Sequence, residues 1–316
     1  MIAGNFAYFF VPSLARMVAG LFILVPVTTY YLDPDDFGIF AIISTLTAVF
    51  VATISVGSSW VLGSNYFKLS KSQNKELLFT TLFLDFILRA KLVIVFWIFG
   101  DLIFPLVIRD YNPAFVIYFK VYLLSTLFNV FWPTVSFLLT LQKKARVHAA
   151  FELGQLTCVA VTTCSFLIVL DFGVMSLVLA PLFTNFVSLI FELIYLRAHV
   201  TACLSSSWMK EVRATGIPFI IPNFIAAFGT SADRYFIQKF SSLDNLGIYA
   251  HAQSYNDALK TVNKAFARTV NPITLQTFVA AADISPVKFS IRIWSAPPTT
   301  AQEWLEYAAA KTNYRL

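Results

Sequence analysis

The sequence predicts an all-α protein that crosses a membrane several times. Of its 316 residues, 58% are hydrophobic and only 13% are charged, whereas soluble domains carry roughly 25% charged residues. The mean hydropathy is +0.72. This composition excludes a soluble globular enzyme, and it excludes disordered and coiled-coil chains because they contain too few apolar residues. Most of the chain is therefore expected to lie in lipid.

Membrane spans are predicted where about 20 mainly apolar residues follow one another, because that length of helix crosses about 30 Å of hydrocarbon. Eight segments meet or approach this condition: residues 6–31, 37–67, 77–108, 121–142, 153–170, 172–191, 214–232 and 246–272. Six of them carry at most one charge. The segments 77–108 and 246–272 carry several each. The first span is too long for a signal-peptide core and is expected to remain in the mature protein.

The loops between the predicted spans differ in charge. Nine Lys and Arg residues lie in the loops 63–76, 142–151 and 197–215, whereas the opposite loops contain only Arg109 and Lys239. The positive-inside rule then places both termini in the cytoplasm. The net charge of +6 is explained by this asymmetry, so no nucleic-acid partner is expected. The lipid bilayer is the expected surrounding.

A seven-residue pattern occurs twice. Asp35–Ala41 recurs as Asp244–Ala250, with four identical residues at an offset of 209 positions. Both copies follow a proline-containing span and face the same side, as expected for two parallel six-helix lobes. The predicted division is an N-lobe over residues 1–200, a cytoplasmic linker over 201–215, a partial C-lobe over 216–284 with two helices, and a cytoplasmic tail over 285–316.

Charged residues inside spans are candidate site residues, because each costs at least about 2.5 to 3.5 kcal/mol at the centre of a helix. The cations expected to line a substrate lumen are Arg16, Lys91, Lys260, Lys264 and Arg268. Lys260, Lys264 and Arg268 are spaced i, i+4, i+8 and form one stripe. Alternatively, their helix leaves the membrane near Lys260 and the side chains reach the headgroups. Arg16 alternatively pairs with a carboxylate.

A second group of charged residues is predicted to couple ions or to hold the lobe interface: Asp85, Arg89, Asp233, Arg234 and Asp257. Asp85 and Arg89 share one helix face, and a local ion pair is the simplest interpretation of that spacing. Asp233 and Arg234 are adjacent and are expected at the interface between the lobes. Glu192 and Lys120 lie at predicted span ends, where solvation explains them.

Motifs of known catalytic and cofactor-binding sites are absent from the sequence. His148, His199 and His251 are widely separated, and neither a phosphate-binding loop nor a dinucleotide-binding glycine motif occurs. Three cysteines are too few and too irregular for a metal site or a disulfide framework. We therefore expect no catalytic residues, no cofactor and no metal. Without a phosphate-binding loop, ATP is not expected as the direct energy source, so any uphill work would come from ion coupling or from downhill consumption of a product.

Two regions of the sequence resemble a known family. The stretches Arg16–Gly20, Pro26–Tyr31 and Leu32–Gly38 look like the opening of Wzx-type polysaccharide flippases. So do Gly216–Pro218, continuing through Ser231–Ile237, and Leu246–Ala250. The resemblance covers about residues 1–284 and places the chain in the multidrug/oligosaccharidyl-lipid/polysaccharide transporter superfamily.

This resemblance implies a fold of at least 12 helices in two lobes. It also implies alternating-access transport of a polyprenyl-diphosphate-linked oligosaccharide, the repeat unit of O-antigen in lipopolysaccharide, of capsule or of exopolysaccharide, across the bacterial inner membrane. Other polysaccharide-assembly membrane proteins are candidate partners. The sequence departs from the family pattern because it ends after the eighth helix, about four helices short.

Three alternatives to a flippase remain open. A membrane-embedded polysaccharide polymerase or ligase would be expected to have a sizeable outer loop, whereas the longest here is about residues 101–115. A cation-coupled drug exporter would favour acidic residues in its cavity. A non-functional truncated remnant is the third alternative.

Overall fold

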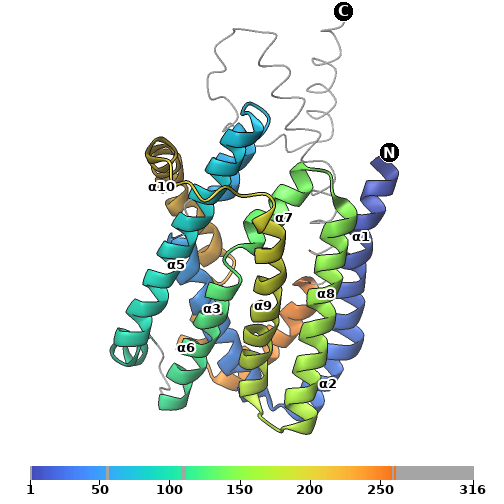
Figure 1. Ribbon diagram of the computed structural model, residues 1–316. Coiled ribbons are helices and arrows are strands. Elements are labelled where there is room, and N and C mark those ends of the chain that lie inside the picture. The colour runs from blue at the N-terminus through green and yellow to red at the C-terminus, as the bar shows by residue number, and fades with distance from the viewer. Residues whose placement is uncertain (1, 55–56, 108–111, 258–259, 261–316) are drawn as a thin grey trace, which may run out of the picture. The chain divides into compact units, whose positions relative to one another are not determined.

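The computed structural model describes residues 2–54, 57–107, 112–257 and 260, and every regular element among them is a helix (Figure 1). All of these residues belong to one compact unit, Met1–Gln276, whereas the second unit, Thr277–Leu316, lies outside the described residues. The predicted tail and most of the predicted span 246–272 are thus not described. The elements are α1 Ile2–Ala19, η1 Gly20–Leu24, α2 Val25–Tyr31, α3 Pro34–Ile54, α4 Ser58–Asn65, α5 Lys71–Val107, α6 Pro113–Phe128, α7 Trp132–Leu141, α8 Ala145–Cys164, η2 Ser165–Val169, α9 Val174–Arg197, α10 Ser206–Gly229 and α11 Ala232–Phe240. Residues 243–257 are also helical.

Six of the described helical segments are long and apolar enough to cross a membrane. They are Phe10–Tyr31, Pro34–Ile54, Pro113–Leu141, Ala145–Val169, Val174–Arg197 and Ser206–Gly229. They correspond to the six predicted spans that carry at most one charge. The polytopic all-α class is therefore confirmed, with element bounds that differ from the predicted ones.

Helix α5 corresponds to the predicted span 77–108. It contains 37 residues and is therefore about 55 Å long at about 1.5 Å per residue. Near its far end, the Asp101 carboxylate lies 2.7 Å from the Nζ atom of Lys120. This pairing corrects the expectation that Lys120 is a solvated residue at a span end. Helix α6 continues through Lys120 and begins at Pro113 rather than at residue 121, because the side chain of Asn112 caps it there by accepting from the backbone N–H of Ala114.

Two predicted spans are each broken into two helices. The segment predicted as one helix over 37–67 is divided between α3 and α4, and Gly57 adopts a left-handed conformation with φ of +61°. The segment predicted over 121–142 is divided between α6 and α7. Pro133 occupies the start of α7, where its missing N–H leaves no hydrogen bond unsatisfied. Gly57 and Pro133 thus stand where one helix ends and the next begins.

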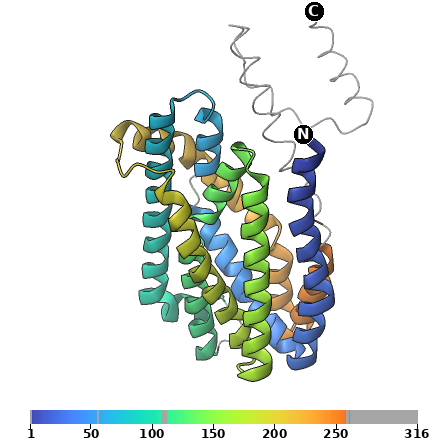
Figure 2. The same cartoon turned by 45° about the vertical axis from the view of Figure 1, so that its right-hand side comes forward.

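The first nine α-helices pack into one bundle, in which α6 lies against α9 and α1 lies against α8 (Figures 1 and 2). Phenylalanine rings from three helices fill its core. Phe119 of α6 contacts Phe96 and Phe104 of α5, with ring centroids 5.4 and 4.8 Å apart, and Phe50 of α3 lies 4.4 Å from Phe96. These rings bury a large apolar area and fix the positions of α3, α5 and α6 relative to one another.

Helix α10 packs against α3, α4 and α5 of this bundle. It begins at Ser206, inside the predicted linker 201–215, so the segment between α9 and α10 is shorter than expected. The short helix α11 then follows the turn at residues 230–231, and the helix over 243–257 comes after it. Leu246 of this last helix is completely buried in the phenylalanine-rich core. The C-terminal helices are therefore packed directly onto α3.

Candidate functional site

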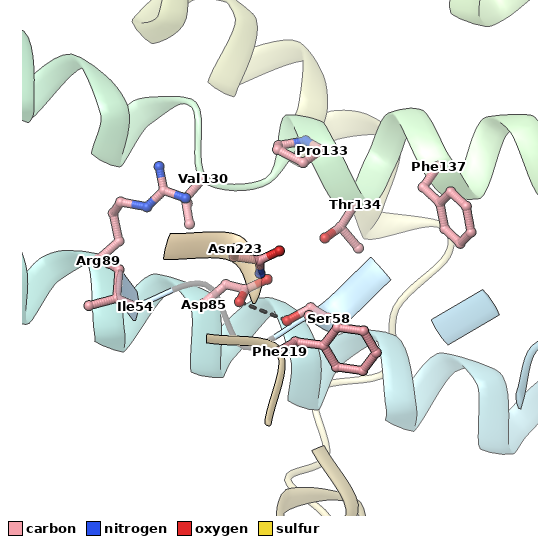
Figure 3. A pocket seen from close by; sticks show the side chains of 11 residues that line it. Ile54, Ser58, Asp85, Arg89, Val130, Pro133, Thr134, Phe137, Phe219 and Asn223 are labelled. Atoms are coloured by element: carbon pink, nitrogen blue, oxygen red, sulfur yellow. Dashed lines mark hydrogen bonds between the residues drawn. The ribbon is translucent and has the colours of Figure 1, made fainter. Parts of the chain in front are cut away.

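A cavity of about 410 Å³ lies where the helix breaks face α10. It is enclosed by the ends of α3 and α4, by α5, by the α6–α7 break and by Phe219 and Asn223 of α10 (Figure 3). Its polar lining consists of Ser58, Asp85, Arg89, Thr134 and Asn223. The cavity is thus placed between the first nine helices and the first helix of the predicted C-lobe.

The glycine at position 57 allows this wall to form. A Cβ atom added there would lie 3.3 Å from the Cβ atom of Phe219, and the left-handed backbone would be strained for any other residue. The same break sets Ser58 at the start of α4, facing α5. The Ser58 hydroxyl therefore donates a hydrogen bond of 2.7 Å to Oδ1 of Asp85.

Asp85 and Arg89 line the cavity without pairing to each other. The ion pairs found among the described residues do not include these two side chains. Instead, Nη1 of Arg89 donates to the backbone oxygen of Thr126 at 3.3 Å, and the guanidinium is turned away from the Asp85 carboxylate (Figure 3). The Nε atom of Arg89 is buried and has no hydrogen-bond partner in the described part of the chain. This guanidinium therefore keeps at least one donor for a ligand.

The predicted lumen cations are not gathered around this cavity. Arg16 lies 3.9 Å from the Glu152 carboxylate, with 44% of its side chain exposed. Lys91 is exposed on α5. Lys260 is also exposed and pairs with Asp257 at 3.0 Å, while Lys264 and Arg268 lie outside the described residues. The cavity is instead lined by Asp85 and Arg89. From the sequence, these two residues were predicted to couple ions or to hold the lobe interface, and not to line the substrate lumen.

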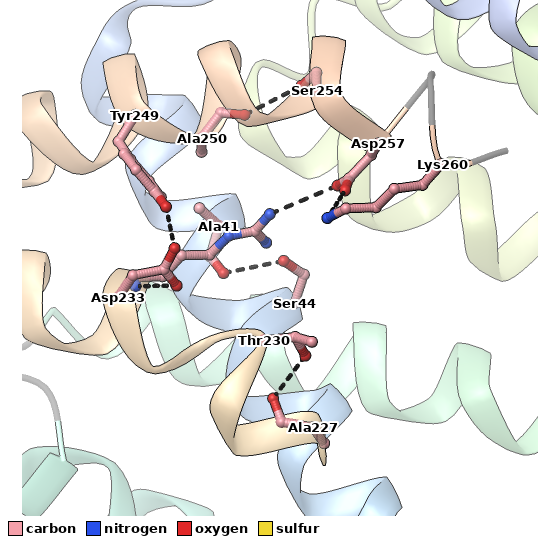
Figure 4. A network of polar contacts seen from close by, with 11 residues as sticks. Ala41, Ser44, Ala227, Thr230, Asp233, Tyr249, Ala250, Ser254, Asp257 and Lys260 are labelled. Carbon is pink, nitrogen blue, oxygen red and sulfur yellow. Dashed lines mark hydrogen bonds and ion pairs between the residues drawn. The ribbon is translucent and has the colours of Figure 1, made fainter. Parts of the chain in front are cut away.

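The remaining candidates join α11 to the helix over 243–257 (Figure 4). The hydroxyl of Tyr249 donates a hydrogen bond to the Asp233 carboxylate. The guanidinium of Arg234 lies 3.9 Å from the Asp257 carboxylate, which also accepts from Lys260. Ala41 and Ser44 of α3 lie beside this network in Figure 4. Asp233, Arg234 and Asp257 thus hold together two helices that pack on α3.

The two copies of the sequence repeat meet in space. A Cβ atom added to Gly38 would collide with the backbone carbonyl of Leu243, and one added to Gly247 would collide with the backbone carbonyl of Pro34. Pro34 and Leu243 are themselves equivalent residues, since they are 209 positions apart. Gly38 thus lies against the residue four positions before Gly247, and Gly247 lies against the residue four positions before Gly38. A reciprocal contact of this kind is expected when two equivalent helices are related by a local two-fold axis. We call this contact the glycine seam.

A hydrogen bond between a side chain and a backbone N–H also links equivalent positions at the start of each helix. Asp36 accepts a hydrogen bond from the backbone N–H of Asp33 at 3.2 Å. In the second copy, the hydroxyl of Ser242 accepts one from the backbone N–H of Asn245 at 3.2 Å. The two bonds join equivalent positions, 33 with 36 and 242 with 245, but the accepting side chain belongs to the later residue in the first copy and to the earlier residue in the second. The close approach of the two helices follows from this shared start and from the glycines.

Glu192 differs from its expected environment. Its position near the end of a predicted span suggested solvation, but the residue is 0% exposed. Neither carboxylate oxygen has a hydrogen-bond partner within the described residues. One predicted span ends just before Glu192, and another begins just after Glu152, which is 3% exposed. Both glutamates were therefore missed as interior residues, although an acidic residue directly bordering an apolar run could have indicated them.

Comparison with known proteins identifies the fold. A family model described as "Polysaccharide biosynthesis protein" matches residues 30–283. No curated protein sequence matches the chain. A solved structure described as "protein A" has a TM-score of 0.67 at 14% identity, over 88% of this chain and 66% of its own length.

Two further structures agree. An outward-facing multidrug resistance MATE family transporter of the MOP superfamily has a TM-score of 0.59 at 16% identity, over 88% of this chain and 70% of its own length. A MOP superfamily transporter from Pyrococcus furiosus has a TM-score of 0.56 at 17% identity, over 88% and 71%. The present chain thus has the fold of these transporters over about two thirds of their length.

Proposed function

We propose that this chain, which belongs to the polysaccharide biosynthesis protein family, carries a polyprenyl-diphosphate-linked oligosaccharide across the bacterial inner membrane by alternating access. The observation that carries this proposal is Arg89 of α5, which lines the cavity beside α10 and whose buried Nε donor has no hydrogen-bond partner among the described residues. A guanidinium binds phosphate oxygens through charge-assisted hydrogen bonds, and its planar array of donors suits a diphosphate. The diphosphate headgroup is therefore the part of the cargo assigned to this cavity.

Alternating access is supported by the glycine seam. In the orientation proposed from the loop charges, with both termini in the cytoplasm, the seam lies at the outer end of α3 and of the helix over 243–257. The seam closes the interface between the two lobes at one end of α3, and the cavity lies at the other end. Lobes that rock against each other require such an arrangement. The repeat unit of O-antigen, capsule or exopolysaccharide is the cargo we propose, and other polysaccharide-assembly membrane proteins are the proposed partners.

The test is complementation of a bacterial strain that lacks its own flippase and therefore displays no surface polysaccharide. Arg89→Gln should abolish surface polysaccharide at an unchanged membrane level of the protein, and Arg89→Lys should retain part of it because the charge remains. Lys91→Gln is the matched control, since it removes an exposed cation from the same helix and should have no effect. Normal polysaccharide with Arg89→Gln would refute the assignment. Replacing both Lys260 and Lys264 with Ala tests the predicted stripe in the same assay.

One observation favours a second candidate function. Asp85 lines the same cavity, and a carboxylate attracts the cationic substrates of drug exporters. Cells that express the chain would then exclude a cationic dye such as ethidium, and Asp85→Asn would abolish the exclusion. The flippase proposal predicts no dye exclusion in either case.

A further inference from the structure

A row of polar side chains crosses the interior between α1, α8 and α7, away from the cavity. The guanidinium of Arg16 lies 3.9 Å from Oε2 of Glu152, and Oε1 of Glu152 lies 3.9 Å from Nε2 of His148. The same nitrogen of His148 lies 2.8 Å from the hydroxyl of Ser136. His148 and Glu152 are 1% and 3% exposed. A histidine, a carboxylate and an arginine thus form one continuous series.

The charges of this series depend on a single proton. Glu152 is the carboxylate between two basic groups, one of which, Arg16, is always charged. When the imidazole of His148 is neutral, the full attraction of Glu152 acts on Arg16. When His148 binds a proton, the imidazolium competes for the same carboxylate, and each cation is held less strongly. Histidine is the side chain that changes charge near neutral pH.

Among the described residues, the helices packed around this series contribute the following other ionisable groups. Helix α7 contains none, and α8 contributes Arg146, whose guanidinium lies over the ring of Tyr8 on α1, 5.2 Å from its centroid. Helix α9 contributes the buried Glu192 and also Tyr195, whose hydroxyl donates to Gln142 at 3.1 Å. Within the described part of the chain, Glu152 is the carboxylate that lies 3.9 Å from both Arg16 and His148.

We propose that His148 and Glu152 form a proton-binding pair that controls Arg16. Uptake of one proton from solvent by His148 draws Glu152 towards the imidazolium and releases the guanidinium of Arg16, 44% of whose side chain is exposed, to bind an anion. Loss of the proton returns Arg16 to Glu152. The proton enters and leaves unchanged, and no covalent bond is made or broken.

The anion-binding half of this proposal rests on the proposed function, because it assigns the released arginine to a second anionic group of the cargo, apart from the diphosphate that the cavity binds through Arg89. Proton uptake and anion binding are then linked, and the linkage is reciprocal: an anion bound to Arg16 favours the proton on His148 by the same factor. A proton gradient would in this way supply the ion coupling that the sequence leaves undecided.

The experiment uses the full chain labelled with [15N]histidine, in vesicles of phosphatidylethanolamine and phosphatidylglycerol, and follows the imidazole signals by solid-state NMR between about pH 5 and about pH 8. The chain has only three histidines. The His148 signal is the one lost in His148→Asn, and the signals of His199 and His251 show in each variant that the protein is folded.

The pair predicts shifts of opposite sign. Glu152→Gln should move the midpoint of the His148 titration to lower pH by about one unit or more, because the imidazolium loses its carboxylate. Arg16→Gln should move it to higher pH, because a competing cation is removed, and Arg16→Lys should leave it near that of the unmodified chain. An unchanged midpoint in both Glu152→Gln and Arg16→Gln, with the other two histidine signals intact, overturns the proposal.

Inorganic diphosphate separates this inference from the proposed function. Binding is read from the 31P signal of diphosphate: Arg89→Gln should remove the cavity site, and Arg16→Gln should remove the second site. If it binds, it should raise the His148 midpoint in the unmodified chain and not in Arg16→Gln, and binding without any such shift overturns the link to Arg16. If it does not bind while the midpoint responds to Glu152 and Arg16 as stated, the proton-binding pair is supported and the proposed function fails.

Discussion

The glycine seam makes a sharp prediction for Gly247→Ala. The added Cβ atom would lie 2.7 Å from the carbonyl carbon of Pro34 and 3.1 Å from the backbone nitrogen of Gly38, whereas carbon atoms in contact are separated by about 3.5 to 4.0 Å. The obstructing atoms belong to the backbone, so no side-chain rotation relieves the overlap. The two helix ends must therefore move apart by roughly 1 Å.

Overpacking of this kind costs about 1 to 3 kcal/mol. We call the seam closed when the two helices are in contact. The ratio of molecules with a closed seam to molecules with separated helices should therefore fall by about 5-fold to 150-fold. The opposite substitution, Gly38→Ala, removes the same contact from the other side and should have a similar effect. Equal effects of the two variants are expected because the contact is two-fold symmetric.

The assay is chemical cross-linking across the seam. Phe37 and His251 lie on opposite sides of it, with ring centroids 5.6 Å apart, and both are replaced by cysteine in a chain whose native cysteines are serine. A short reagent that reacts with two thiols should link the pair rapidly, and Gly247→Ala should slow the reaction in proportion to the fall in the fraction of closed molecules, up to about 5-fold to 150-fold where the closed seam is the minor state. Gly154→Ala is the control, since no atom lies within 4 Å of its added Cβ. Equal cross-linking in Gly247→Ala and the control would refute the symmetric close contact.

Three further predictions concern the stability of the purified protein in detergent. Glu192→Gln should leave the melting temperature unchanged or raise it, because it removes a buried carboxylate without a hydrogen-bond partner among the described residues. Glu152→Gln should lower the melting temperature, because it removes the carboxylate that lies beside Arg16 and His148. A lower melting temperature for Glu192→Gln alone would contradict this prediction. Gly57→Ala should destabilise by about 1 to 2 kcal/mol because of its left-handed backbone, and an unchanged denaturation midpoint would show that the strain is absent. Tyr249→Phe should cost about 1 kcal/mol through loss of the hydrogen bond to Asp233, and this loss should disappear when Asp233 is already Asn.

The helix breaks show where local sequence patterns stop being informative. Hydropathy alone identified the apolar segments over 37–67 and 121–142, because the length and polarity of a segment are properties of that segment. It did not show that each contains two helices. Gly57 and Pro133 permit a change of direction but do not require one. The cavity forms because both breaks face α10, and this depends on packing among helices distant in the sequence.

Charged residues show the same limit for the candidate site. Arg89 was recognised as a candidate because a charge inside an apolar helix is costly wherever the helix packs. Its spacing from Asp85 suggested an ion pair, yet Asp85 bonds to Ser58, which is 27 positions away. Glu152 and Glu192 were treated as span boundaries, although both are buried. The partner of a charge is decided by neighbouring helices, and a single helix does not contain that information.

The sequence by itself determined that this protein is an all-α membrane protein, the order of its membrane-crossing segments, and the existence of two similar helix starts 209 positions apart. These features follow from the cost of placing polar groups in hydrocarbon and from direct comparison of residues. Only the tertiary structure decided that Gly38 and Gly247 lie against each other's helix, that Arg89 faces a cavity, and that His148 and Glu152 lie beside Arg16. The reason is physical: close packing and charge pairing act over a few ångströms in space, and only folding brings these distant residues within that range.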